Sequence, residues 1–253
     1  MNELAAKRPT RIGLGTNRLT DTPANRSFLQ AAVAEGIDFI DTAHLYTSGE
    51  SERAIGEALA PFPPGLIVGS KGAYAKGSGP DDLRRHVAES LERLRTETLE
   101  LYYVHRMQPE HSVAAMVSVL AEYVDAGSIA HAGVSEVTIE EIELARTVVP
   151  IAAVQNQYSL GEQGHDEVVD FCAAEDILFV PFFPLRGGDA AAIGEVAGAH
   201  GATPHQVKLA WLLKRSPVML PIPGTLSLAH LRENLGALEL ELSDEEFERL
   251  RTA

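Results

Sequence analysis

The chain has 253 residues, 45% hydrophobic and 23% charged, which is typical of a globular protein. Its formal net charge of −15, with no basic segment to offset it, argues against nucleic acid or an anionic membrane surface as a partner. A single cysteine, Cys172, excludes a disulfide framework and a metal site built from several cysteines. No apolar run approaches membrane-spanning length and the first ten residues carry no signal-peptide segment, so we expect a cytoplasmic protein.

Short apolar runs alternate with helical patterns along the whole chain. The runs are rich in β-branched and aromatic residues, and each precedes a stretch with apolar residues at helical spacing. Several helices have clear starts, such as Thr22-Pro23 and Thr203-Pro204, where a capping side chain precedes proline. We predict strands at 11–15, 37–41, 66–70, 99–104, 129–134, 152–154, 177–180 and 218–222.

Eight strand–helix units in 253 residues predict an α/β fold of the (β/α)8 TIM-barrel type, forming a single domain over residues 1–253. No linker rich in Pro, Gly or Ser divides the chain. A doubly wound open sheet is the alternative, but no Gly-x-Gly-x-x-Gly motif follows a strand to support it.

Polar and aromatic residues stand at the carboxyl ends of the predicted strands. In a TIM barrel these ends face one cup, so the side chains are expected to converge. Each residue alone has an ordinary explanation; Lys71, for example, can be a solvated loop lysine. Their coincidence at so many strand ends predicts an active site. The residues are Asp41, Lys71, His105, Ser135, Gln155 and Phe182.

Tyr46 follows Asp41 by five residues, in a loop of small residues. The alternative is that Asp41 caps the next helix and Tyr46 packs on it. A phenol has a pKa near ~10, and a cation such as Lys71 stabilises its phenolate, while Asp41 can hold the ammonium in place. His105 can donate a hydrogen bond to a substrate oxygen. The set suits proton delivery to an oxygen that is becoming an alkoxide, and a nicotinamide cofactor is the natural hydride donor.

From Arg11 to its C-terminus the chain resembles the aldo-keto reductases. The resemblance implies a catalytic tetrad of Asp41, Tyr46, Lys71 and His105, with Tyr46 as the general acid. The segments that carry it are 36–46 (GIDFIDTAHLY), 68–71 (VGSK), 101–105 (LYYVH), 133–135 (GVS), 154–156 (VQN), 221–224 (PIPG) and 233–234 (EN).

The resemblance also implies NADPH as the cofactor, with NADH as an alternative donor. Ser135 and Gln155 would hold the nicotinamide carboxamide, Phe182 would stack on the ring, and residues 224–234 would bind the adenosine end and its 2′-phosphate. Further cofactor contacts are expected from Thr16, Asn17, Pro184, Leu185, Gly187, Pro223, Gly224, Thr225, Ser227, His230 and Asn234.

Several positions depart from the family pattern. Glu136 stands where the family usually has asparagine. Its carboxylate either lies near the nicotinamide or turns outward to cap the helix that begins near Thr138. Gly224 and His230 replace a lysine and an arginine of the phosphate site, which predicts a reduced preference for NADPH over NADH. The N-terminal hairpin and the long C-terminal loop of the family are expected to be short or missing.

The main prediction is therefore a reductase that converts a small aldehyde or ketone to the alcohol, expected to be a monomer. Residues 180–185 (VPFFPL), 222–225 (IPGT) and 230–234 (HLREN) look most like bacterial pyridoxal reductases, so a pyridoxal reductase is one alternative. A non-catalytic, nicotinamide-sensing protein on the same barrel is the other, as in the potassium-channel β-subunits that resemble aldo-keto reductases. Steady NADPH consumption with a reactive aldehyde separates catalysis from sensing.

Overall fold

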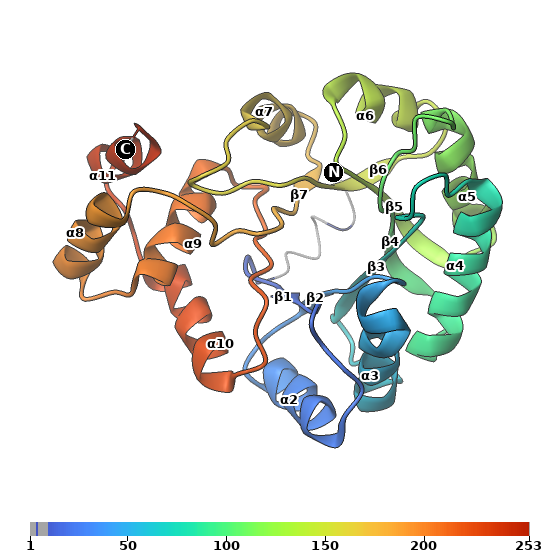
Figure 1. Ribbon diagram of the computed structural model, residues 1–253, viewed down its shortest axis with the longest axis horizontal. Coiled ribbons are helices and arrows are strands. Elements are labelled where there is room, and N and C mark those ends of the chain that lie inside the picture. Colours follow the sequence, from blue (N-terminus) through green and yellow to red (C-terminus); the bar gives the residue numbers. More distant parts are fainter. Residues whose placement is uncertain (1–3, 5–9, 253) are drawn as a thin grey trace.

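The computed structural model of the chain describes residue 4 and residues 10–252. In these residues one sheet of seven parallel strands, each beside its neighbour in chain order, lies inside a ring of helices (Figure 1). The strands are β1 (Leu14–Gly15), β2 (Phe39–Asp41), β3 (Ile67–Gly72), β4 (Leu99–Val104), β5 (Ile129–Ser135), β6 (Ile151–Gln155) and β7 (Leu178–Phe179).

The predicted eighth strand, 218–222, closes the ring without forming a regular strand. On one side its backbone makes two hydrogen bonds of 2.9 Å with Phe179 of β7, and on the other side Pro221 O accepts a 2.9 Å bond from Gly13 N. Three prolines between residues 217 and 223 remove N–H donors, so a continuous ladder cannot form. The barrel prediction is confirmed, and the open doubly wound sheet is wrong.

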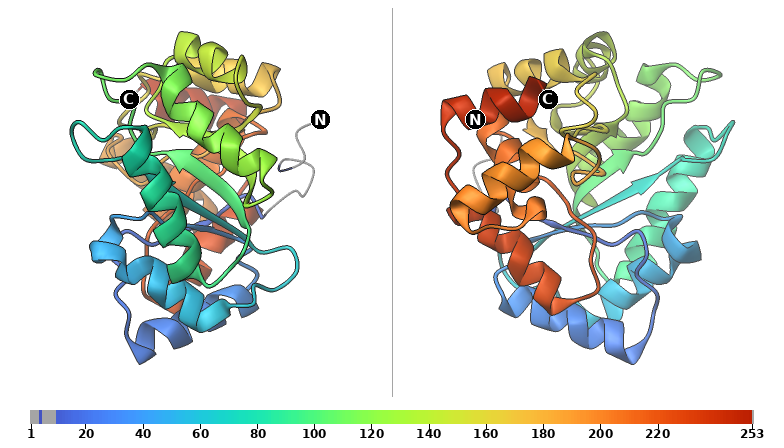
Figure 2. Two further views of the ribbon diagram at one scale, coloured as in Figure 1. Left: turned by 90° about the vertical axis from the view of Figure 1, so that its right-hand side faces the viewer. Right: turned by 60° about the vertical axis from the view of Figure 1, so that its left-hand side comes forward.

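Helices follow the strands and cover the outside of the barrel (Figure 2). Thr22 and Thr203 cap their helices as predicted, each accepting a hydrogen bond from the backbone N–H three residues on. The helix that begins at Leu228 ends at Leu235 and continues as a 3-10 turn. The helices are α2 (Pro23–Ala34), α3 (Glu50–Leu59), α4 (Pro80–Leu94), α5 (Val113–Asp125), α6 (Ile139–Arg146), α7 (Asp166–Ala174), α8 (Ala190–His200), α9 (Pro204–Arg215), α10 (Leu228–Leu235) and α11 (Asp244–Thr252), with 3-10 turns η1 (Tyr46–Gly49) and η2 (Gly236–Glu239).

Two apolar layers hold the barrel together. The larger lies between the sheet and the helices and includes Cys172, which is buried there as a core residue. The smaller fills the barrel interior, where Phe39, Leu101 and Tyr103 pack together with Leu4. The sequence predicts that the N-terminal hairpin of the family is short or missing. That prediction applies to the N-terminal segment, of which residues 1–3 and 5–9 lie outside the described residues.

The last described helix, α11, packs beside α8, where His200 Nε2 and Glu246 Oε1 are 2.8 Å apart (Figure 2). Its N-terminus is capped by Ser243, with Glu246 as the reciprocal partner. Across residue 4 and residues 10–252, no helix is both long and apolar enough to cross a membrane. The same residues hold no group of three or more His, Cys, Asp or Glu side chains arranged to bind a metal ion.

Candidate active site

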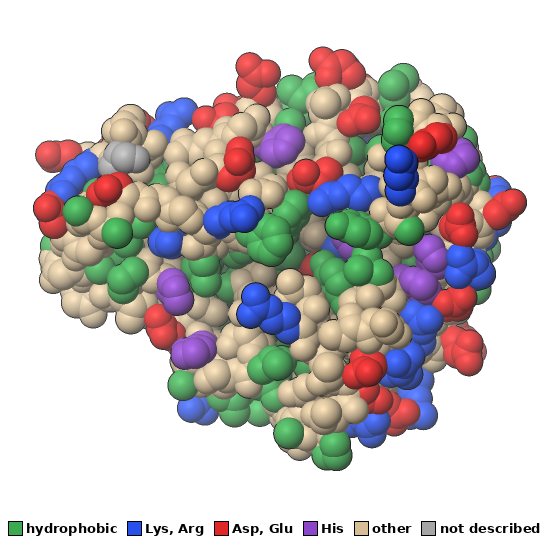
Figure 3. Space-filling view, viewed as in Figure 1, with side chains coloured by type: hydrophobic (Ala, Val, Ile, Leu, Met, Phe, Trp, Pro, Cys, Tyr) green, Lys and Arg blue, Asp and Glu red, His purple; other side chains and the backbone are tan. Residues whose placement is uncertain are grey.

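The carboxyl ends of the strands open into a cavity of about 830 Å³. Apolar and basic side chains gather around the hollow centre of this face (Figure 3). Lys71 lies buried beneath the floor of the cavity, and Gly187, Ser227 and Asn234 do not line it. The predicted residues that do line it are Thr16, Asn17, Asp41, Tyr46, His105, Ser135, Gln155, Phe182, Pro184, Leu185, Pro223, Gly224, Thr225 and His230.

Lys71 and Asp41 form a buried ion pair at the ends of β3 and β2. Lys71 Nζ donates to Asp41 Oδ1 at 2.7 Å and to Thr42 O at 2.6 Å, and Gln155 Nε2 donates to Asp41 Oδ2 at 2.8 Å. Burial lowers the pKa of Lys71, but Asp41 and Tyr46 outweigh it, so the pKa is raised overall. The ammonium is therefore kept charged inside the barrel, and Asp41 does not cap the following helix.

Tyr46 is brought over this ion pair by the turn η1. Thr47 and Ser48 adopt positive φ values of 46° and 56°, and Thr47 Oγ1 anchors the turn by donating to Leu19 O at 2.6 Å. The Tyr46 ring centroid is then 5.0 Å from Lys71 Nζ. Burial raises the pKa of the Tyr46 phenol above its ordinary value, while Lys71 acts in the opposite direction. The phenol is thus protonated at neutral pH, with a cation beside it to stabilise the phenolate.

His105 faces Tyr46 across the cavity floor. Their ring centroids are 6.0 Å apart at an edge-to-face angle of 81°, and the Tyr74 ring centroid is 4.8 Å from that of the imidazole. Burial, followed by the positive charges of Lys71 and Arg106, holds the pKa of His105 well below its usual value. The Nδ1 atom of His105 is buried without a hydrogen-bond partner among the described residues. The ring is therefore a neutral imidazole with hydrogen-bonding capacity left for a ligand.

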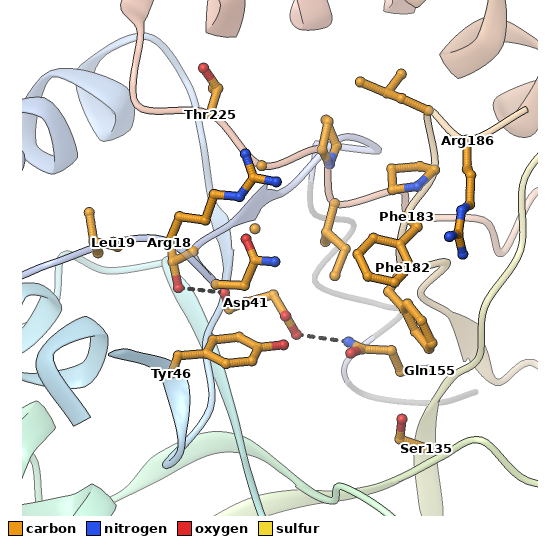
Figure 4. A pocket seen from close by; sticks show the side chains of 18 of the residues that line it. Arg18, Leu19, Asp41, Tyr46, Ser135, Gln155, Phe182, Phe183, Arg186 and Thr225 are labelled. Carbon is orange, nitrogen blue, oxygen red and sulfur yellow. Dashed lines mark hydrogen bonds between the residues drawn. The ribbon is translucent and has the colours of Figure 1, made fainter. Parts of the chain in front are cut away.

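Ser135 and Gln155 end the adjacent strands β5 and β6, where they stand opposite each other in the ladder. In Figure 4, Tyr46 and Gln155 face each other across Asp41, and Phe182 lies above Gln155. The amide nitrogen of Gln155 donates a hydrogen bond to Asp41. This wall places one hydroxyl, one amide and one aromatic ring on the same side of the cavity.

Glu136 follows Ser135 with a φ of +55°, a conformation that asparagine tolerates better than glutamate. Its Oε1 accepts a 2.6 Å hydrogen bond from Gln157 N, and its Oε2 lies 3.9 Å from an Arg106 nitrogen. The predicted alternative that Glu136 caps α6 is wrong. That helix is capped by Thr138 and Glu141 in a reciprocal capping box, which leaves no role there for a second carboxylate.

The far end of the cavity reaches the N-terminus of α10. Ser227 caps this helix, and Thr225 Oγ1 accepts a 3.0 Å hydrogen bond from Ser227 N. Thr225 and His230 line the cavity, whereas Arg232 is engaged outside it by Glu35 at 2.6 Å. A helix N-terminus with hydroxyl donors favours an anion even with few cations nearby.

Sequence reasoning missed several residues of the cavity wall, above all Arg18, Tyr74, Arg106 and Arg186. In Figure 4, the Arg18 side chain extends toward the side where Thr225 lies. Arg18 and Arg106 directly follow Asn17 and His105, so adjacency to predicted site residues was the available signal.

Comparisons with known proteins agree with this fold and site. A profile described as "Aldo/keto reductase family" matches residues 11–191 and 189–253, and the chain belongs to this family. Pyridoxine 4-dehydrogenase of Escherichia coli is 35% identical over 96% of this chain and 94% of its own length. An uncharacterized oxidoreductase of Schizosaccharomyces pombe is also 35% identical, over 95% of this chain and 85% of its own.

Solved structures give the same picture. A thermostable aldo-keto reductase in complex with the inhibitor epalrestat superimposes with a TM-score of 0.88 at 32% identity, covering 96% of this chain and 94% of its own. An aldo/keto reductase from Klebsiella pneumoniae in complex with NADP and acetate gives a TM-score of 0.83 at 28% identity, over 95% and 90% of the two chains.

Proposed function

We propose that this chain reduces an aldehyde or ketone to the alcohol with NADPH as the hydride donor, and that Tyr46 is the general acid. The observation that carries the proposal is the placement of Lys71 between Asp41 and Tyr46, at 2.7 Å from the carboxylate and 5.0 Å from the ring centroid. Membership in the aldo-keto reductase family supports it.

In the proposed reaction the carbonyl oxygen lies between Tyr46 and His105. The neutral imidazole of His105 donates a hydrogen bond that orients the carbonyl and stabilises the developing negative charge. Tyr46 delivers its proton to that oxygen. Lys71 lowers the cost of the phenolate left behind, and Asp41 keeps Lys71 charged and in place. The nicotinamide, when bound, supplies the hydride to the carbonyl carbon.

The residues present fit an extended dinucleotide. The cavity runs from Gln155 at the barrel centre to His230 on α10. Ser135, Gln155 and Phe182 would hold the nicotinamide end, and Thr225 at the N-terminus of α10 would receive the adenosine phosphate. The Klebsiella pneumoniae relatives are described in complex with NADP and with NADPH, which supports the same cofactor here. The remaining predicted contacts, at Gly187, Ser227 and Asn234, stay predictions.

Pyridoxal is a second candidate substrate, favoured by the 35% identity with pyridoxine 4-dehydrogenase. The test is a panel of aldehydes and ketones that includes pyridoxal, run with NADPH and with NADH and followed by the loss of reduced nicotinamide. A Tyr46→Phe variant is the matched control because it keeps the ring and removes the proton. Tight NADPH binding without turnover of any carbonyl compound would instead support the nicotinamide-sensing alternative.

The assembly and location expected from the sequence also belong to this proposal. We propose a monomer in the cytoplasm. Light scattering at micromolar concentration tests the first, and fractionation of cells that express the native gene tests the second.

A further inference from the structure

Arg106 stands at the substrate end of the cavity, directly after His105. Its guanidinium carbon lies 5.7 Å from the ring centroid of Tyr74 and 5.6 Å from that of Phe182, so the cation is placed between two aromatic rings. These rings come from the loops after β3 and β7, on different sides of the barrel mouth. The arrangement favours a positive charge at this position.

The hydrogen-bonding capacity of this guanidinium is not used up by the protein. Its NH1 atom is buried and has no hydrogen-bond partner among the described residues. Glu136 Oε2 is 3.9 Å away, too far for a hydrogen bond. The other oxygen of Glu136 is held by Gln157 N at 2.6 Å, which fixes the carboxylate at that distance. A buried donor without a partner is costly. The Arg106 side chain as a whole is 30% exposed and lines the cavity, so a small rotation of the guanidinium would bring this donor to a ligand oxygen.

The mouth of the cavity is apolar around this charge. Large hydrophobic side chains are exposed on its wall, and such a patch on a surface rich in acidic residues marks a binding region. Figure 3 shows hydrophobic and basic side chains side by side around the hollow. The exposed residues on the wall are Leu45 at 40%, Tyr74 at 48%, Phe183 at 51% and Leu226 at 46%.

We propose that Arg106 is a specificity-determining residue that binds a carboxylate of the substrate, and that this enzyme prefers aromatic or otherwise apolar carbonyl compounds that carry such a group. The inference rests on the proposed carbonyl reduction. A planar guanidinium matches a carboxylate through two parallel hydrogen bonds, and the two rings beside it leave one side of the cation open to the cavity for this contact. The carbonyl group then reaches His105, the neighbouring residue, while the apolar part of the substrate covers Tyr74 and Phe183.

The experiment compares 3-carboxybenzaldehyde with its methyl ester, which keeps the ring and the aldehyde and removes the charge. We measure kcat/KM for both at saturating NADPH, and the readout is the ratio of acid to ester. Arg106→Gln is expected to lower the ratio about 10- to 100-fold, which is the range for hydrogen bonds to a charged group. Arg106→Lys keeps the charge but not the paired donors, so its ratio of acid to ester is expected to lie between those of the wild type and Arg106→Gln.

Glu136→Gln gives a test in the opposite direction. Glutamine keeps an acceptor for Gln157 N but removes the negative charge that would repel a substrate carboxylate at Arg106. We expect the acid-to-ester ratio to rise about 2- to 10-fold, as for partly screened charges. Arg186→Gln is the matched control, because it removes a cavity arginine that contacts the Phe183 ring and has no ion pair with a carboxylate among the described residues. It should leave the ratio unchanged.

Three results would overturn the proposal. The first is a wild-type ratio of acid to ester at or below one. The second is an Arg106→Gln variant in which kcat/KM falls equally for acid and ester, and the third is a change of the ratio in Arg186→Gln as large as that in Arg106→Gln. Replacing the acid by 3-formylphenyl phosphate identifies the anion, and a stronger preference for the phosphate would contradict the carboxylate assignment. Failure of the proposed function is visible separately, as absence of turnover with every aldehyde. Calorimetric titration of the NADPH-loaded protein with both compounds then still measures the preference as a ratio of Kd values.

Discussion

Lys71 Nζ lies 2.7 Å from Asp41 Oδ1 with both side chains withdrawn from solvent, at 0% and 2% exposed. Such a pair is weak support for stability, because desolvation of two charges offsets most of their attraction. Its value here is positional, since it holds a cation 5.0 Å from the Tyr46 ring centroid. Stability and activity should therefore respond differently when the pair is removed one member at a time or as a whole.

Asp41→Asn and Lys71→Met are each expected to lower the free energy of unfolding by about 3–5 kcal/mol, because each leaves an unpaired buried charge. The double variant should recover much of that loss, since asparagine still accepts from Gln155 Nε2 and methionine fills the space of the lysine stem. All three should lose most carbonyl reduction. Urea denaturation and steady-state kinetics on the four proteins check this. A double variant as unstable as the worse single one would contradict it.

Tyr46→Phe is expected to lower kcat for carbonyl reduction by roughly 10²–10⁴-fold, the usual worth of general acid catalysis. NADPH binding should stay close to wild type, because the ring is kept. A variant that retains most of its turnover number would rule out Tyr46 as the proton donor.

The pH dependence follows from the same phenol. Its pKa is raised, so the protonated form needed for reduction persists through neutral pH, and the rate of reduction falls only when the pH rises toward that pKa. Oxidation of the alcohol needs the phenolate and should increase over the same alkaline range. Initial rates in both directions from neutral to alkaline pH test it. Profiles with the same slope in the two directions would contradict it.

The elements that carry the tetrad could be predicted from sequence because each depends on local signals. Asp41 and His105 each follow an apolar run directly, and a short strand bounded by a polar residue is visible without tertiary information. The segment 218–222 has the same apolar pattern, but it contains and adjoins prolines, which lack a backbone N–H. Whether a strand forms there depends on whether a neighbouring strand would need those N–H groups as donors, and the sequence does not show this.

The wall of the cavity was less predictable, because its geometry depends on loops far apart in the chain. Arg106 contacts both Tyr74 and Phe182, and although the barrel predicts that the loops face one cup, no local sequence signal indicates that side chains of these two loops reach the same guanidinium. The contacts of Glu136 were unpredictable for a different reason. Its backbone has a positive φ, which the sequence does not indicate for a glutamate, and its carboxylate accepts from Gln157 N and does not cap α6.

NADPH should be preferred over NADH, but less than in a protein with a basic clamp at the phosphate site. Thr225 and the N-terminus of α10 offer neutral donors, and Arg232 is engaged by Glu35. His230→Arg should increase the ratio of kcat/KM for NADPH to that for NADH, because a permanent charge then faces the 2′-phosphate. Arg232→Gln is the control and should change the ratio little. A wild-type ratio in favour of NADH would overturn the assignment.

His86 packs near the floor of the site, and its protonation should affect the stability of the fold in acid. Its Nδ1 accepts a 3.0 Å hydrogen bond from Ala73 N, two residues after Lys71, and its ring stacks on His44 at 3.9 Å. Burial, followed by the nearby charges of His44 and Arg85, lowers the pKa of His86 to about 4. Protonation of Nδ1 would also remove the acceptor for Ala73 N, so the folded protein resists it.

The sign of the resulting pH dependence is fixed by this lowered pKa. Between the ordinary histidine pKa near ~6.5 and about 4, the unfolded chain binds a proton that the folded protein does not. The free energy of unfolding should therefore fall as the pH drops through this range, with a contribution from His86 of up to about 1.4 kcal/mol per pH unit. Above this range the contribution is fully present and constant.

His86→Asn keeps an acceptor for Ala73 N without titrating, so its stability should depend less steeply on pH. His205→Asn, at an exposed position on α9, is the matched control for the loss of one imidazole. Urea denaturation of the three proteins at a series of pH values measures the slopes, and the contribution of His105 is common to all of them. Equal slopes for the wild type and His86→Asn would show that His86 is not the group that titrates.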